Sequence, residues 1–82
     1  MKFYQIVEVD TQTCEGWDIW EGFDFDEALK AKEKAISDFE YYHTPREKKV
    51  RVLEFRLYDI PDDTDIDDKM ELAAVALDYD QF

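Results

Sequence analysis

One stretch with helical periodicity, flanked on both sides by strand-like runs, constrains the fold more than any other feature of this sequence. It is FDFDEALKAKEKAISDFEYYH, residues 23–43. Asp24 and Glu27 stand three positions apart, an aspartate variant of the capping box that marks a helix start. One stripe then holds Phe25, Leu29, Ile36 and Phe39, with Ala28 and Ala35 beside it and Lys32 within it. The pattern predicts a helix over about 25–42 that stops before Pro45.

Three runs around this helix have the alternation and the β-branched or aromatic content of strands. They are KFYQIVEVD (2–10), WDIWEGF (17–23) and VRVLEFRLYDI (50–60). The polar segment TQTCEG joins the first two, which favours a β-hairpin. In the third run, Leu53, Phe55 and Leu57 alternate with polar neighbours, whereas Val50 and Val52 have the opposite phase. This predicts either a bulge or a strand with both faces partly covered.

The remaining segments complete an α+β fold. TPREKK, residues 44–49, reads as a polar loop. From about residue 66 the apolar residues keep helical spacing, which predicts a second helix to about 79. The expected order is therefore β-β-α-β-α, a three-stranded sheet with two helices packed on it. At 82 residues and without a linker-like segment, 1–82 is expected to be a single domain.

The sequence lacks the residues that several classes of function require. The chain has one cysteine and one histidine, so it offers no intramolecular disulfide and no histidine pair for a metal. Its only glycines are Gly16 and Gly22, which excludes a glycine-rich phosphate loop. We therefore expect no enzyme activity, no metal and no cofactor. No apolar run approaches the roughly 20 residues of a membrane span, and we expect a cytoplasmic protein without a membrane partner.

The charge is large and segregated. The net charge is −12, and it divides into −7 over residues 1–28, +3 over 29–58 and −8 over 59–82. Phosphates are attracted by Lys and Arg, so direct nucleic-acid binding is not expected of the acidic segments. A basic protein surface is their natural complement.

The run DIPDDTDIDD, residues 59–68, allows three interpretations. Its alternating aspartates open like a calcium loop, but Asp68 stands where the sharp turn needs glycine and Ala74 where the bidentate glutamate belongs. Helix capping by Thr64 or Asp65 explains two or three of the acids. A partner-binding surface would account for the others.

Two further segments each allow more than one interpretation. Trp17 and Trp20 are three apart, so a regular strand points them to opposite faces. Either both fill the core, or one is exposed among carboxylates as an interface anchor. The basic cluster TPREKKVR, residues 44–51, is expected to be a solvated segment that pairs with the protein's own acids, rather than a nucleic-acid site.

Two acidic clusters, WDIWEGFDFDE (17–27) and DIPDDTDIDD (59–68), make the profile similar to the small acidic inhibitors of phages and mobile elements, the anti-CRISPR proteins and related DNA mimics. The resemblance implies a protein that occupies the basic groove of a CRISPR effector or restriction-type nuclease. The alternative is an antitoxin-like or regulatory adaptor that binds a basic protein or homodimerises through a sheet edge. The predicted partner-binding residues are Trp17, Asp18, Trp20, Glu21, Asp24, Asp26, Asp59, Asp62, Asp63, Asp65, Asp67 and Asp68.

Overall fold

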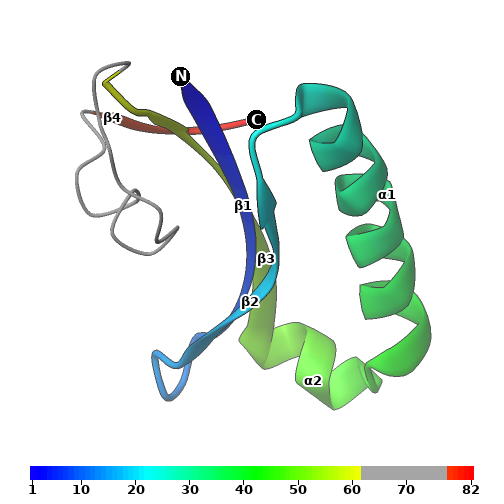
Figure 1. Ribbon diagram of the computed structural model, residues 1–82. Coiled ribbons are helices and arrows are strands. Elements are labelled where there is room, and N and C mark those ends of the chain that lie inside the picture. The colour runs from blue at the N-terminus through cyan, green and yellow to red at the C-terminus, as the bar shows by residue number, and fades with distance from the viewer. Residues whose placement is uncertain (62–77) are drawn as a thin grey trace.

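The computed structural model describes residues 1–61 and 78–82, and it has an α+β architecture (Figure 1). The elements in chain order are β1 (Lys2–Asp10), β2 (Gly16–Gly22), α1 (Phe25–Tyr42), α2 (Pro45–Val50), β3 (Arg51–Asp59) and β4 (Asp78–Gln81). The predicted second helix falls mainly on 62–77, outside the described residues. Its predicted end at 79 is wrong, because Asp78 already belongs to β4.

The sheet has four strands in the order β2-β1-β3-β4, not the predicted three, and every neighbouring pair is antiparallel. β1 is paired along its whole length with β3, from Lys2 opposite Asp59 to Asp10 opposite Arg51, without a register shift. The bulge expected in the third strand is therefore absent from this pairing. β4 covers only the last part of β3, between Arg56 and Asp59.

A bulge does occur in β2. Ile6 of β1 pairs with Trp20, whereas the next residue, Val7, pairs with Asp18, so Ile19 has no residue opposite it. An extra residue shifts the side-chain alternation by one position. This shift decides which way the two tryptophans of β2 point.

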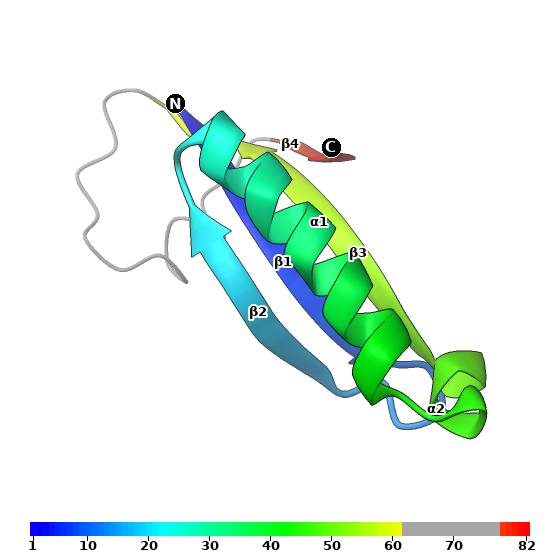
Figure 2. The ribbon, with the colours of Figure 1, turned by 90° about the vertical axis from the view of Figure 1, so that its right-hand side faces the viewer.

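The helix α1 packs on one face of the sheet, along β1 and between β2 and β3 (Figure 2). Its predicted bounds are confirmed, and Asp24 is the N-cap, since its carboxylate accepts a 2.9 Å hydrogen bond from the Glu27 N–H. His43 is the C-cap, with its N–H donated to the Phe39 carbonyl.

The part of α1 that meets the sheet is not the large apolar stripe. Ala28 and Ala35 are buried, whereas Phe25, Leu29 and Ile36 are half-exposed. Alanines allow the helix axis to approach the sheet closely, which leaves the larger neighbours at the helix flank. The centre of the core is instead in β1, where Phe3 and Ile6 are fully buried.

Residues 45–50 form the short helix α2, so the prediction of a loop at 44–49 is wrong. Thr44 accepts a hydrogen bond from the Glu47 N–H, and the Glu47 carboxylate accepts one from the Thr44 N–H. Pro45 occupies the first turn, where its missing N–H costs nothing. The sequence T-P-R-E is a complete capping box, and six residues were too few for periodicity to reveal the helix.

Candidate functional site: an acidic pole with half-exposed aromatic rings

The antiparallel topology gathers the acidic chain segments at one end of the molecule. β1 and α1 begin at this end, β2 and β3 finish there, and β4 starts there (Figure 1). We call this end the acidic pole. Its described acidic positions are Asp24, Asp26, Glu27, Asp59, Asp78 and Asp80.

The predicted residues Asp24, Asp26 and Asp59 therefore lie at the same end of the molecule, although the first two are far from the third in sequence. Asp24 and Asp26 lie at the N-terminus of α1, where the helix dipole favours negative charge. The helix dipole therefore stabilises both carboxylates without a binding partner, and both residues are exposed.

At the end of β3 the backbone register brings three charged positions side by side. Asp59 pairs in register with Asp78 on one side and with Lys2 on the other, and Lys2 forms an ion pair with Asp59. Lys2 therefore offsets part of the negative charge of the acidic pole.

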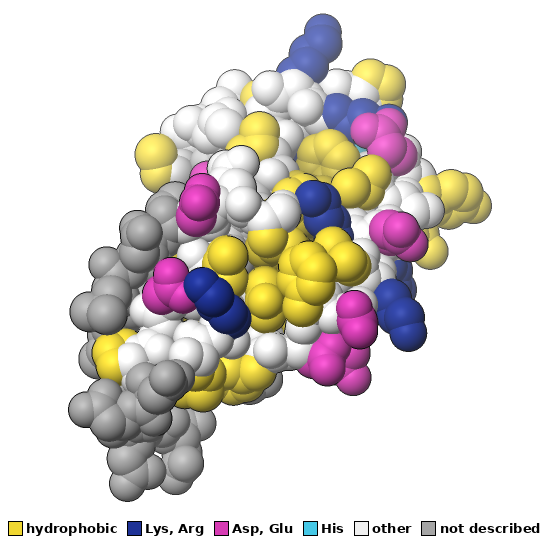
Figure 3. All heavy atoms as spheres, turned by 90° about the horizontal axis from the view of Figure 1, so that it is seen from above, with side chains coloured by type: hydrophobic (Ala, Val, Ile, Leu, Met, Phe, Trp, Pro, Cys, Tyr) yellow, Lys and Arg dark blue, Asp and Glu magenta, His cyan; other side chains and the backbone are white. Residues whose placement is uncertain are grey.

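Aromatic and apolar side chains lie among these carboxylates. Phe23, Phe25 and Met1 are each 41–50% exposed. The Phe23 ring lies 5.4 Å from Phe3, and the Phe25 ring lies 5.6 Å from Tyr4, so each ring is held from one side by the core. Figure 3 looks down on this end and shows hydrophobic side chains gathered at the centre with charged side chains around them.

Phe23 and Phe25 were missed as site residues. The alternation F-D-F-D over 23–26 was the available signal, because it interleaves rings and carboxylates just before the helix turns toward the sheet. It was interpreted only as the start of the helix and the edge of its apolar stripe. The half-exposed aromatic side chains at the pole are therefore Phe23 and Phe25 rather than the tryptophans.

The other predicted residues of β2 do not belong to the pole. Asp18 and Glu21 lie on the sheet face opposite α1, where Asp18 accepts a 2.8 Å hydrogen bond from the Gln5 amide. Tyr58 donates to the Gln5 carbonyl oxygen, so a polar chain crosses three strands on this face. The carboxylate of Asp18 thus has a structural partner within the sheet.

The expectation that Trp17 and Trp20 point to opposite faces is wrong, because the bulge at Ile19 restores them to the same face. Both pair with β1 residues that face α1, Trp17 with Glu8 and Trp20 with Ile6. Trp17 is 43% exposed, so the tryptophans do not both fill the core. The Arg51 guanidinium lies 5.3 Å from its ring centre.

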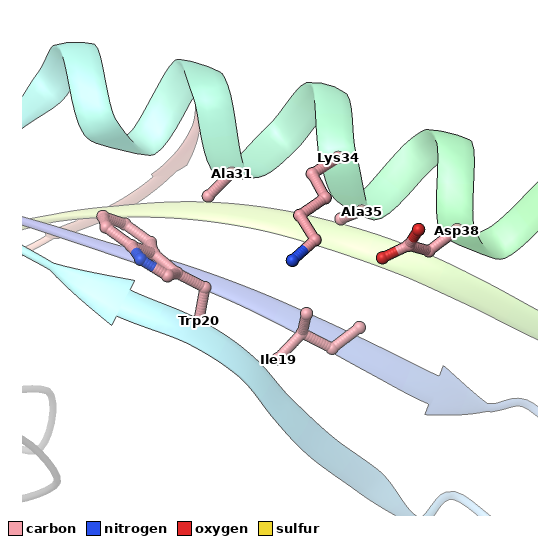
Figure 4. Close-up of a pocket in the computed structure, with 6 residues that line it drawn as sticks. All are labelled: Ile19, Trp20, Ala31, Lys34, Ala35 and Asp38. Carbon is pink, nitrogen blue, oxygen red and sulfur yellow. The ribbon is translucent and has the colours of Figure 1, made fainter.

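Trp20 borders a shallow cavity of about 170 Å³ between β2 and α1. Its lining residues are Ile19, Trp20, Ala31, Lys34, Ala35 and Asp38 (Figure 4). The Trp20 ring also lies against Gly22, where a Cβ atom would come within 2.8 Å of the indole. Lys34 and Asp38 are the charged residues of this lining, and the other four lining residues are apolar.

The basic cluster is at the opposite end and pairs with the protein's own acids, as predicted for a solvated segment. Arg51 lies 3.5 Å from Glu8, 3.4 Å from Glu47 and 3.9 Å from Asp10. Lys48 forms a 3.0 Å pair with Glu40. In the described chain these acidic partners all lie outside the aspartate run 59–68.

The aspartates Asp62, Asp63, Asp65, Asp67 and Asp68 lie outside the described residues. Within 1–61 and 78–82, no three histidine, cysteine or acidic side chains come close enough to share a metal ion. Neither described helix combines the length and the apolar character that a membrane crossing needs. Comparison with known protein families, curated proteins and solved structures finds no match to this chain.

Proposed function

We propose that this protein is a non-enzymatic acidic binding protein. It inhibits a nucleic-acid-handling protein, of the CRISPR-effector or restriction-nuclease type, by inserting its acidic pole into the basic DNA-binding groove. The observation that carries the proposal is that the ends of α1, β3 and β4, with Asp24, Asp26 and Asp59, meet at one end of the molecule, where the rings of Phe23 and Phe25 are half-exposed on the two sides of the sheet.

Each part of this surface has a role in such binding. The carboxylates raise the association rate by long-range attraction to a basic groove, an effect that salt screens. The rings supply apolar area for affinity, and they are held by Phe3 and Tyr4, so little conformational entropy is lost on binding.

The test is affinity capture of a partner on the immobilised protein, followed by stepwise salt elution and by competition with duplex DNA. The proposal predicts a nuclease or other DNA-binding protein that elutes at moderate salt and is displaced by DNA. A captured protein that resists both salt and duplex DNA would contradict it.

A second candidate function is the adaptor, which binds a basic protein without imitating DNA. The observation that favours it is the exposed apolar flank of α1, with Leu29 at 39% and Ile36 at 44% exposure, away from the acidic N-terminus of the helix. An adaptor that binds through this flank would depend on Ile36 and would be insensitive to DNA. Replacing Ile36 with Lys therefore separates the two functions, because it leaves the acidic pole unchanged.

A further inference from the structure

The cavity between α1 and β2 exists because small residues meet a tilted ring. Ala31 and Ala35 line it from the helix, where larger side chains would fill the space. On the strand side, the Trp20 ring lies back against Gly22, and Ile19 is the extra residue of the bulge. The volume is about 170 Å³, and a cavity of about 150 Å³ already holds benzene. An apolar group of about that size therefore fits beside the indole.

Two opposite charges border the apolar part of this cavity. Lys34 and Asp38 are one turn apart on α1, and Figure 4 shows the lysine reaching toward β2 with the carboxylate turned to the same side. Neither side chain forms an ion pair with any residue in the part of the chain that the structure describes. A lysine four residues before an acid is also the weaker order for a pair on a helix. Within the described chain, both charges are therefore available to a ligand.

We propose that this cavity binds a free α-amino acid with an apolar side chain of about leucine's size. The carboxylate of the ligand would bind the Lys34 ammonium, and the ammonium of the ligand would bind Asp38. The apolar side chain would lie against Trp20 and Ala31. The proposal does not rest on the acidic pole, since no carboxylate of the pole lines the cavity.

The pair of charges selects a zwitterion over singly charged apolar molecules. An apolar anion would bring its charge near Asp38 with nothing to offset the repulsion, and an apolar amine would do the same near Lys34. The net charge of −12 also repels ligands that carry only negative charge. An α-amino acid carries one charge of each sign on neighbouring groups and has no net charge, so it satisfies both cavity residues at once.

An NMR titration of the isotope-labelled protein with leucine tests the proposal. The Trp20 indole N–H resonance reports on the cavity, and the Trp17 indole is an internal reference because Trp17 does not line it. Leucine should shift the Trp20 resonance saturably with a Kd on the order of 1 mM, as expected for so small a ligand in an open site. Glycine, which lacks the apolar side chain, should bind roughly tenfold more weakly.

Two blocked analogues and four variants separate the two charges. Leucinamide lacks the carboxylate, and N-acetylleucine lacks the ammonium. At about 0.15 M salt, Lys34→Gln should reduce the preference for leucine over leucinamide by roughly three- to fivefold, while Lys30→Gln, an equal change of charge outside the cavity, should not. Asp38→Asn should reduce the preference for leucine over N-acetylleucine by a similar factor, with Glu33→Gln as its control.

Filling the cavity is a test that does not depend on charge. Ala31→Leu keeps a good helix former and places a larger side chain where the ligand's own would lie, so it should abolish the leucine-dependent shift of Trp20. Full binding by this variant would overturn the proposal. So would a Trp20 resonance that leucine does not shift, or equal effects of Lys34→Gln and Lys30→Gln, because the ligand would then respond only to overall charge.

Discussion

Replacing Gly22 with alanine should destabilise the protein through one specific contact, the Trp20 ring. A Cβ atom at position 22 would lie 2.8 Å from Cη2 and 2.9 Å from Cζ2 of the indole, closer than van der Waals contact allows. The backbone itself is not strained for alanine, since Gly22 has no positive φ. The ring must therefore move toward the cavity that it borders.

The magnitude follows from two opposing terms. An added methyl group that displaces a packed side chain costs about 1–3 kcal/mol. Alanine in place of glycine also stabilises the protein by about 0.4–1 kcal/mol, because it lowers the conformational entropy of the unfolded chain. The net loss for Gly22→Ala is about 1–2 kcal/mol, which lowers the Tm of a domain this small by roughly 4–16 °C.

Gly16 at the start of the same strand is the matched control. Its added Cβ would meet Val7 Cγ1 at 3.4 Å, an ordinary contact, so Gly16→Ala should leave stability unchanged or raise it by about 0.5 kcal/mol. Thermal unfolding by far-UV circular dichroism measures both variants, and near-UV circular dichroism reports the Trp20 environment. If Gly22→Ala melts no lower than Gly16→Ala and keeps the near-UV spectrum, Trp20 does not lie on Gly22.

Three further changes test other parts of the structure. Asp24→Ala should cost about 1 kcal/mol in urea unfolding, while Asp24→Asn, which still caps α1, should cost much less. Glu8→Gln should lower the free energy of unfolding by about 1–2 kcal/mol, because this ion-paired carboxylate is only 12% exposed. Glu54→Gln, at 30% exposure, should lower it by less than about 0.5 kcal/mol. Equal losses of stability in the two variants would contradict the argument from burial. Hydrogen bonds from Thr44 lower the pKa of Glu47 from its usual value of 4.5. The capping box therefore stabilises α2 above pH 4.5, and this stabilisation is lost as the pH falls through the lowered pKa. The NMR chemical shift of the Thr44 amide should change with pH below 4.5, and this change should be absent from the Glu47→Gln variant.

The local elements of this fold were predictable because their signals are contained within the elements. The cap at Asp24 and the helical spacing after it gave the bounds of α1, and the alternation of Leu53, Phe55 and Leu57 gave the face of β3 that turns toward α1. The strand β4 was not predictable. Its residues DYDQ place Asp78 opposite Asp59, and only tertiary pairing explains a strand there.

The sequence predicted the negative charge of the candidate site but not how its residues are arranged in space. Sequence showed that acids dominate around Asp24 and Asp59, but their approach depends on an antiparallel topology that no local pattern specifies. The bulge at Ile19 has no sequence signal of its own. The regular alternation of strand side chains therefore predicted the wrong face for one of the two tryptophans, Trp17 and Trp20.

The central claim is that the acidic pole, and not net charge alone, binds the partner. The most direct measurement compares the Kd of the captured partner for the native protein with two triple variants that change charge equally. One neutralises the pole, with Asp24→Asn, Asp26→Asn and Asp59→Asn. The other neutralises exposed acids elsewhere, with the substitutions Glu15→Gln, Glu33→Gln and Asp38→Asn.

The account predicts that the pole variant binds at least roughly tenfold more weakly than the control variant at low salt, a difference of about 1.4 kcal/mol. The gap should narrow as salt rises, because screening removes the attraction that only the pole supplies. Equal affinity of the two variants for the partner would contradict the account, since the acidity would then act through total charge rather than through the acidic pole.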